Sequence, residues 1–221
     1  MSVKYRAPAS YPRNQDHIEH GTIHTLAGLV PGDSVVFAFT QSKRGGGTCL
    51  AFMLMRAMAR LDPRWRIPPG KNTFTLQKSA LGRPCLLLGD KPGPSLSFSH
   101  GEGRIWAAMC GKGSVGIDVA YPEEFAGDYP FARVFRPEEL DFARKLCHND
   151  TTRAAALIWS AKEASVKASG AGFNRLDPRE VRVGAPLFKE QGILFEVLAD
   201  RPISTWTKTE GRGWLSVALR K

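Results

Sequence analysis

The residues best suited to chemistry lie in a short segment, 159–167, with the sequence WSAKEASVK. Its composition favours a helix, and Glu163 and Lys167 stand four residues apart. Both side chains therefore project from one helix face, with their Cβ atoms about 5–6 Å apart. A carboxylate suits a cation and an ammonium suits an anion, so the pair fits a substrate that combines a metal ion with phosphate. The alternative is a solvated salt bridge, which contributes only about 0.3–0.5 kcal/mol.

A second candidate lies in residues 115–120, which have the sequence VGIDVA and the pattern of a strand. Alternate residues point into a core, whereas Asp118 points the other way, between the small residues Gly116 and Ala120. Aspartate is depleted in strands, so this carboxylate either faces water at a sheet edge or has a partner such as a metal ion. With Glu163 it would supply two carboxylates, a typical protein contribution to a Mg²⁺ site whose other ligands are water and phosphate. Such a site supports phosphoryl transfer.

The elements that must position these residues follow from hydrophobic patterning. We predict helices over 48–61, 137–147 and 150–170, and strands over 33–40, 73–77, 96–100, 104–110, 115–119, 193–198, 203–208 and 214–219. Thr48 is expected to cap the first helix, and Asn149 or Asp150 the last, while the proline-rich residues 62–72 form a loop. The order strand, helix, strands occurs twice, on either side of residue 115, which predicts an α+β protein with two similar-sized halves.

The composition is that of an ordinary soluble globular protein, with 43% hydrophobic and 24% charged residues in a chain of 221. The N-terminal residues lack the apolar core of a secretory signal, and the longest apolar run, Cys49–Met55, is too short to cross a bilayer. The four cysteines are widely separated, which favours reduced, buried thiols. We therefore expect a cytoplasmic protein without membrane association.

The formal net charge of +10 favours polyanionic partners. Nucleic acid, a phosphorylated cofactor and an acidic protein would all be attracted by this charge. The basic residues are spread along the chain, without an arginine-rich arm or an aromatic-studded sheet motif. Charge alone does not choose between these partners.

The motifs GIDVA at 116–120 and WSAKEASVK at 159–167 resemble the two signature motifs of the 4′-phosphopantetheinyl transferases. These enzymes move the phosphopantetheine arm of coenzyme A onto a serine of a carrier protein. Two further elements, SFSH at 97–100 and GRP at 82–84, are similar to elements of the longer, surfactin-type group. The resemblance covers roughly residues 80–170, and jointly these motifs are specific.

The resemblance implies a pseudo-twofold fold of two α/β halves in a monomeric chain. The N-terminal half, 1–114, would contact the nucleotide of coenzyme A, and the C-terminal half, 115–221, would carry the metal site. Asp118 and Glu163 would hold Mg²⁺ against the pyrophosphate of coenzyme A. Lys167 would contact that pyrophosphate and stabilise the departing 3′,5′-ADP.

The resemblance also assigns residues to the nucleotide end of coenzyme A. Arg83, Ser99 and His100 would bind there, at its 3′-phosphate, and Lys43 or Arg44 would reach the same phosphate. His100 has an alternative role as a histidine at a strand end whose hydrogen bonds are satisfied within the protein.

One position departs from the surfactin-type pattern, in which a second acid commonly follows the motif aspartate by two residues. Here that position is Ala120, which would share the face of Asp118. Several groups are therefore candidates for the general base that deprotonates the carrier serine: Glu163, a metal-bound water, and Glu123 or Glu124 in the following loop.

The sequence thus predicts a Mg²⁺-dependent 4′-phosphopantetheinyl transferase that uses coenzyme A and serves an acidic acyl or peptidyl carrier protein. Two rival hypotheses remain. Ala120 motivates a degenerate family member that binds coenzyme A or a carrier without catalysis. Charge alone motivates a basic nucleic-acid-binding protein.

Overall fold

The fold is known from a computed structural model. It describes residues 5–6, 23–27, 34–41, 45–66, 74–79, 82–173, 175–189 and 191–221. The chain divides into two compact units, Met1–Gly113 and Ser114–Lys221. The described residues form four α-helices and three sheets, in which all paired strands are antiparallel. In these ranges, no helix combines the length and the apolar character that a membrane crossing requires.

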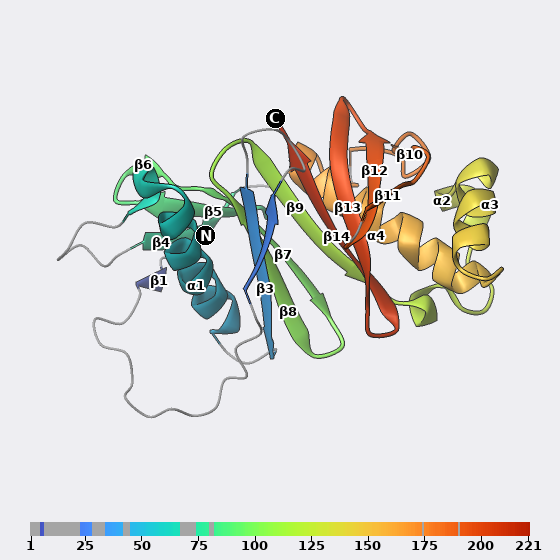
Figure 1. The fold of residues 1–221 in the computed structure, drawn as a ribbon, viewed down its shortest axis with the longest axis horizontal. Helices are drawn as coiled ribbons and strands as arrows, with labels where there is room; N and C mark the ends of the chain where they lie inside the picture. Colours follow the sequence, from blue (N-terminus) through green and yellow to red (C-terminus); the bar gives the residue numbers. More distant parts are fainter. Residues whose placement is uncertain are drawn as a thin grey trace. The chain divides into compact units, whose positions relative to one another are not determined.

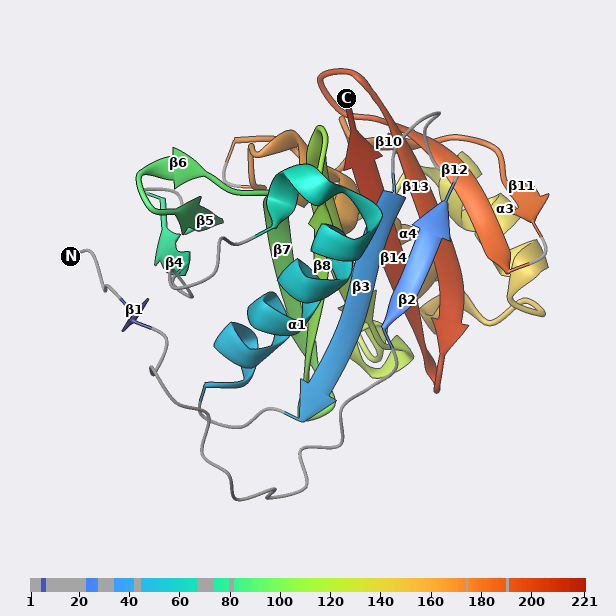
Figure 2. The ribbon, with the colours of Figure 1, turned by 60° about the vertical axis from the view of Figure 1, so that its left-hand side comes forward.

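The first unit contains a main sheet with the strand order β2–β3–β8–β7 and a small sheet with the order β1–β4–β5–β6. Its elements are β1 (Tyr5–Arg6), β2 (His24–Ala27), β3 (Ser34–Gln41), α1 (Gly46–Leu61), the 3₁₀ turn η1 (Pro63–Trp65), β4 (Phe74–Lys78), β5 (Pro84–Leu88), β6 (Lys91–Pro92), β7 (Ser95–Gly101) and β8 (Arg104–Cys110). Helix α1 lies against the main sheet (Figure 2). Its buried residues Leu50 and Leu54 share one hydrophobic core with Met109 of the main sheet and Leu86 of the small sheet.

Helix α1 begins at Gly46, two residues earlier than predicted, and the prediction that Thr48 caps it is wrong. The N-cap residue is Gly45, whose φ of 83° is left-handed and whose position has no side-chain cap. A Cβ atom on Gly46 would lie 3.3 Å from the carbonyl oxygen of Gln41 and 3.2 Å from the side chain of Ile105. Glycine at these two positions therefore lets α1 begin close to the end of β3, which residue patterning alone did not reveal.

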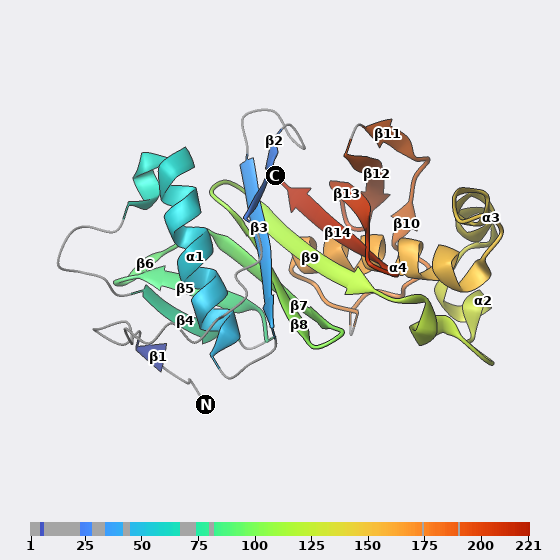
Figure 3. The same cartoon turned by 60° about the horizontal axis from the view of Figure 1, so that its bottom comes forward.

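The second unit contains a sheet with the strand order β10–β12–β13–β14–β9, in which β11 also pairs with β12. Its elements are β9 (Ser114–Ala120), the 3₁₀ turn η2 (Pro122–Phe125), α2 (Phe131–Val134), α3 (Pro137–Leu146), α4 (Thr151–Ser169), β10 (Arg182–Val183), β11 (Leu187–Lys189), β12 (Gly192–Leu198), β13 (Pro202–Glu210) and β14 (Gly213–Arg220). Helix α4 lies along one face of this sheet (Figure 1). Helix α3 packs against α4 (Figure 3).

Both ends of α4 follow the predicted signals. The Asp150 carboxylate accepts a hydrogen bond of 3.0 Å from the backbone N–H of Arg153, so Asp150 is the N-cap. Gly170 ends the helix with a left-handed φ of 80°. The helix that carries the WSAKEASVK motif is therefore defined by local sequence at both termini.

Gly116 of β9 allows α4 to approach the sheet at backbone distance. A Cβ atom at this position would lie 1.9 Å from the carbonyl oxygen of Ala164 and 2.7 Å from the backbone nitrogen of Ala168. Neither backbone atom is the end of a flexible side chain, so the contact tolerates no side chain. The position of α4 over β9 therefore depends on glycine at 116.

We expect Gly116→Ala to destabilise the protein by about 3 kcal/mol, because the added methyl group must push α4 away from β9. Chemical denaturation would measure the loss. Gly47→Ala is a suitable control, since its Cβ would meet only the Phe98 ring, at 3.7 Å, and alanine favours a helix. The control is expected to leave stability unchanged or raise it by up to about 1 kcal/mol. A loss at Gly116 no larger than the control's change would contradict this role.

All four cysteines are free thiols, as predicted. Cys110 and Cys147 are buried, whereas Cys49 and Cys85 are partly exposed, so the prediction of burial holds for two of them. Burial raises the pKa of the Cys147 thiol to about 11, which the nearby Arg153 offsets only in part. Cys147 is therefore an unreactive core residue at neutral pH.

Candidate functional site

Three charged side chains converge between α4 and β9. The ammonium of Lys167 lies 2.7 Å from Oδ1 of Asp118 and 3.8 Å from Oε1 of Glu163. It also donates a hydrogen bond of 3.2 Å to the carbonyl oxygen of Ile117. Lys167 therefore bonds more closely to Asp118 than to its helix neighbour Glu163, and the motif is more than an isolated i,i+4 salt bridge.

This cluster is only partly accessible to solvent. The Asp118 side chain is 4% exposed, which excludes the alternative of a water-facing aspartate, while those of Lys167 and Glu163 are 28% and 32% exposed. Burial acts to lower the pKa of Lys167, but the attraction of Asp118 and Glu163 outweighs it, so this pKa is raised. Lys167 is therefore a permanent cation at physiological pH.

Strand periodicity and helix geometry bring these groups together. Asp118 shares the α4-facing side of β9 with Gly116, whose missing side chain lets the helix come close. Side chains in a helix tilt toward its N-terminus, so the stem of Lys167 extends back along α4 toward Asp118. Glu163 lies one turn earlier on the same face.

The donor set of the cluster suits a hard divalent cation. Asp118 and Glu163 present carboxylate oxygens to the same Lys167 nitrogen, so the two groups lie close together. Within the described residues, no group of three or more His, Cys, Asp or Glu side chains is arranged to hold a metal ion. Two carboxylates without soft ligands fit the chemistry of Mg²⁺, which completes its shell with water and phosphate oxygens.

Ala120 stands where the surfactin-type pattern commonly has a second acid, and it is buried. The next acidic residues, Glu123 and Glu124, lie in η2. Glu124 accepts a hydrogen bond of 2.7 Å from the backbone N–H of Tyr121. Burial raises the pKa of Glu124, the Tyr121 hydrogen bond opposes this, and the charge of Glu163 raises it further. Glu124 is thus electrostatically coupled to Glu163, whereas Glu123 forms a surface ion pair of 2.8 Å with Arg212.

The other lysine of the motif, Lys162, points into the core instead. Its ammonium lies 2.7 Å from Oε2 of Glu139, with side-chain exposures of 0% and 2%. It also donates hydrogen bonds to the carbonyl oxygens of Pro178, at 2.9 Å, and Val134, at 3.3 Å. Burial lowers the pKa of Lys162, and Glu139 offsets part of this effect. Lys162 therefore fastens α4 to α3 and to the segments around it.

Trp159 of the motif packs against other aromatic rings. Its ring stacks on Phe173 with centroids 5.0 Å apart and meets Phe135 edge-on at 6.5 Å. The ring contributes to the hydrophobic core between the helices and the sheet. Its place in the motif is explained by packing.

The residues predicted to bind the nucleotide end of coenzyme A lie in the first unit. The structure does not bring all of them together. Arg83 donates a hydrogen bond of 3.4 Å to Ser95, at the beginning of β7. His100 lies near the opposite end of that strand, roughly 17 Å away along it. Ser99 is buried and His100 exposed, because adjacent strand residues face opposite sides. Lys43 and Arg44 lie outside the described residues.

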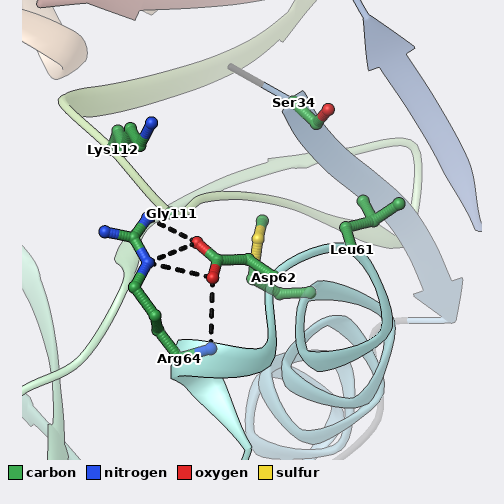
Figure 4. A pocket seen from close by; sticks show the side chains of 7 residues that line it. Ser34, Leu61, Asp62, Arg64, Gly111 and Lys112 are labelled. Atoms are coloured by element: carbon green, nitrogen blue, oxygen red, sulfur yellow. Dashed lines mark hydrogen bonds and ion pairs between the residues drawn. The ribbon is translucent and has the colours of Figure 1, made fainter. Parts of the chain in front are cut away.

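A cavity of about 360 Å³ in the first unit contains none of the predicted site residues. Asp62, Arg64 and Lys112 line it, and Figure 4 shows Arg64 folded over Asp62. Hydrogen bonds from the Arg64 side chain hold the pKa of Asp62 at about 2. Asp62 also accepts the backbone N–H of Arg64 and so caps η1, which makes the pair part of a turn.

Residues 114–210 match the family model of the 4′-phosphopantetheinyl transferase superfamily. The match begins with the first residue of the second unit and includes Asp118, Glu163 and Lys167. It supports the superfamily and a transferase of this family, and the mixed α/β architecture with four helices is consistent with that fold. No curated protein matches the chain.

Proposed function

We propose that this protein transfers the 4′-phosphopantetheine arm of coenzyme A to a serine of an apo carrier protein in a Mg²⁺-dependent reaction. One observation carries the proposal: Asp118, Glu163 and Lys167 converge within the segment that matches the superfamily. Two carboxylates for a cation and one ammonium for phosphate are the groups that a pyrophosphate substrate requires.

In the proposed reaction, the carrier serine Oγ attacks the β-phosphorus of coenzyme A. The new Oγ–P bond forms as the bond from this phosphorus to the bridging oxygen breaks, and 3′,5′-ADP leaves with the electron pair. The serine proton passes to a general base. Glu163, Glu123 and Glu124 are the protein's candidates for this base, and the coupling of Glu124 to Glu163 favours Glu124 over the surface-paired Glu123.

Asp118 and Glu163 would hold Mg²⁺, which when bound neutralises charge on the pyrophosphate and its leaving group. Lys167 would move from its bond with Asp118 to the phosphate oxygens of the substrate. There its ammonium would offset the negative charge that develops on 3′,5′-ADP.

Residues of the N-terminal half would also contact coenzyme A. Arg83, Ser99 and His100, with Lys43 or Arg44, would bind the nucleotide end of coenzyme A from the N-terminal half. Because Arg83 and His100 lie roughly 17 Å apart along β7, these two would contact different parts of that nucleotide. A surfactin-type, pseudo-twofold organisation is supported by the presence in each unit of an antiparallel sheet with one long helix on its face. We further propose a cytoplasmic monomer whose +10 charge attracts an acidic carrier and coenzyme A.

Mass spectrometry of apo carrier proteins separates this function from its rivals. The protein is incubated with coenzyme A, Mg²⁺ and carriers of fatty-acid, polyketide and nonribosomal-peptide type. We expect a phosphopantetheine mass gain on at least one carrier. Coenzyme A binding without a mass gain on any carrier would favour the degenerate member that Ala120 motivates. Salt-sensitive gel shifts of DNA or RNA without coenzyme A binding would favour a nucleic-acid-binding protein.

A further inference from the structure

A row of polar residues crosses the sheet of the second unit beneath α4. Thr207 of β13 is paired with Ser216 of β14, and Ser216 is paired with Asp118 of β9. Thr207 and Ser216 are fully buried. The Ser216 hydroxyl lies 2.8 Å from that of Thr207 and 2.8 Å from that of Ser160 on α4. The row that contains Asp118 is therefore tied to the helix by hydroxyl groups.

The direction of these hydrogen bonds follows from counting protons, because each hydroxyl has one to donate. Ser160 donates its proton to the carbonyl oxygen of Leu157, at 3.1 Å. With Ser160 donating to this carbonyl, the arrangement that gives every hydroxyl proton an acceptor has Ser216 donating to Ser160 and Thr207 donating to Ser216. The chain of donors runs from β13 through β14 into the backbone of α4, and each of its hydroxyl protons has an acceptor.

A second row lies two residues further along the same strands and has a different character. Thr205 is paired with Ala218, which is paired with Gly116. Thr205 bonds to Ser165 of α4 at 2.8 Å, and Ser165 donates to the carbonyl oxygen of Ala161. This row is also fixed by the backbone contact at Gly116. The second row therefore serves as a matched comparison for the first. Its hydroxyl groups are buried and hydrogen-bonded to α4 in the same way, but the row does not contain Asp118.

Helix α4 runs in the same direction as β14. The indole N–H of Trp214 donates to the carbonyl oxygen of Arg153, and Arg220 donates to that of Ser169. Ser160 thus lies at the level of Asp118, and Glu163 follows three residues later on the same helix face. A shift of α4 along its axis would move Glu163 and Lys167 together relative to Asp118. The Ser160–Ser216 bond opposes such a shift at the level of the site.

We propose that Ser216, with Ser160, is a positioning residue that sets the register of α4 and so holds Glu163 and Lys167 against Asp118. The catalytic meaning of this role rests on the proposed function, whereas the positioning itself does not. Ser216 lies beyond the segment that matches the superfamily. Apolar side chains would also pack the helix on the sheet, but a directional hydroxyl chain fixes where it lies.

The test compares Ser216→Ala with Thr205→Val, each of which removes one buried hydroxyl from a row that spans three strands. We expect both variants to lower the melting temperature by about 2–8 °C. The first readout is acylation of Lys167 by acetic anhydride in the free protein, quantified by peptide mass spectrometry. Ser216→Ala should increase Lys167 acylation severalfold, because the bond to Asp118 is loosened, whereas Thr205→Val should stay near the wild-type rate.

The second readout is Mn²⁺ affinity, measured by electron paramagnetic resonance. Ser216→Ala should weaken Mn²⁺ binding about tenfold, as expected for groups that orient metal ligands, and Thr205→Val should not. Equal acylation in the two variants would overturn the positioning role, whatever the protein's activity. Increased acylation in Ser216→Ala alone, with no Mn²⁺ binding by the wild type, would support positioning and count against the proposed function.

Discussion

Replacing Asp118 with asparagine is expected to reduce phosphopantetheine transfer by about 10³-fold. The amide keeps the size of the carboxylate but removes the charge that would hold Mg²⁺. Glu163→Gln should have a comparable effect, because within the described residues no third His, Cys, Asp or Glu side chain joins Asp118 and Glu163 in a group arranged to hold a metal ion. The rate of mass gain on an apo carrier measures both variants, and circular dichroism checks that the fold is retained.

Asp200→Asn is a matched control for these variants. Asp200 lies in the same unit and forms an ion pair of 2.8 Å with Arg220, and its side chain is 47% exposed. It has no assigned part in metal binding. Transfer by Asp200→Asn should stay near the wild-type rate. If Asp118→Asn and Glu163→Gln also retained near-normal rates, the assignment of the metal ligands would be wrong.

Replacing Lys162 with methionine is expected to cost about 3–5 kcal/mol of stability. Methionine fills a similar volume, but it leaves the buried carboxylate of Glu139 without the cation that lies 2.7 Å away. Glu139 also accepts hydrogen bonds from the backbone N–H groups of Arg136 and Val183, so it is held in place and cannot turn to solvent. Guanidinium denaturation at neutral pH measures the loss.

Two further variants sharpen this prediction. Adding Glu139→Gln to Lys162→Met removes the uncompensated charge and should recover part of the lost stability. Arg212→Met breaks an ion pair of 2.8 Å whose side chains are 72% and 56% exposed, so little change in stability is expected. Transfer by Lys162→Met, assayed well below its melting temperature, should remain near normal. A small stability loss with a large loss of transfer would contradict a structural role for this lysine.

Local sequence patterns predicted the parts of the site that depend on one element at a time. Alternation along β9 placed Asp118 opposite the apolar residues, and the four-residue spacing placed Glu163 and Lys167 on one helix face. Asp150 and Gly170 marked the ends of α4 because capping depends on nearby backbone groups. The bond between Lys167 and Asp118 was not predicted, since it depends on how closely α4 approaches the sheet.

The residues that sequence patterns missed depend on pairing between distant segments. Ser216 and Thr207 acquire their role only through strand register, and the one available signal was the alternation of Thr205 with Thr207 in a predicted strand. Lysine is rarely buried, so the pairing of Lys162 with Glu139 had no local signature. Short strands such as β10 and β11 were missed because two or three residues carry too little periodicity.

The most direct measurement is the metal-dependent mass of an apo carrier protein after incubation with this protein and coenzyme A. We predict a phosphopantetheine addition on the carrier serine that requires Mg²⁺, disappears with a chelator, and is lost in Asp118→Asn. If the wild-type protein binds coenzyme A but leaves carriers of all three types unmodified, the transferase function is contradicted.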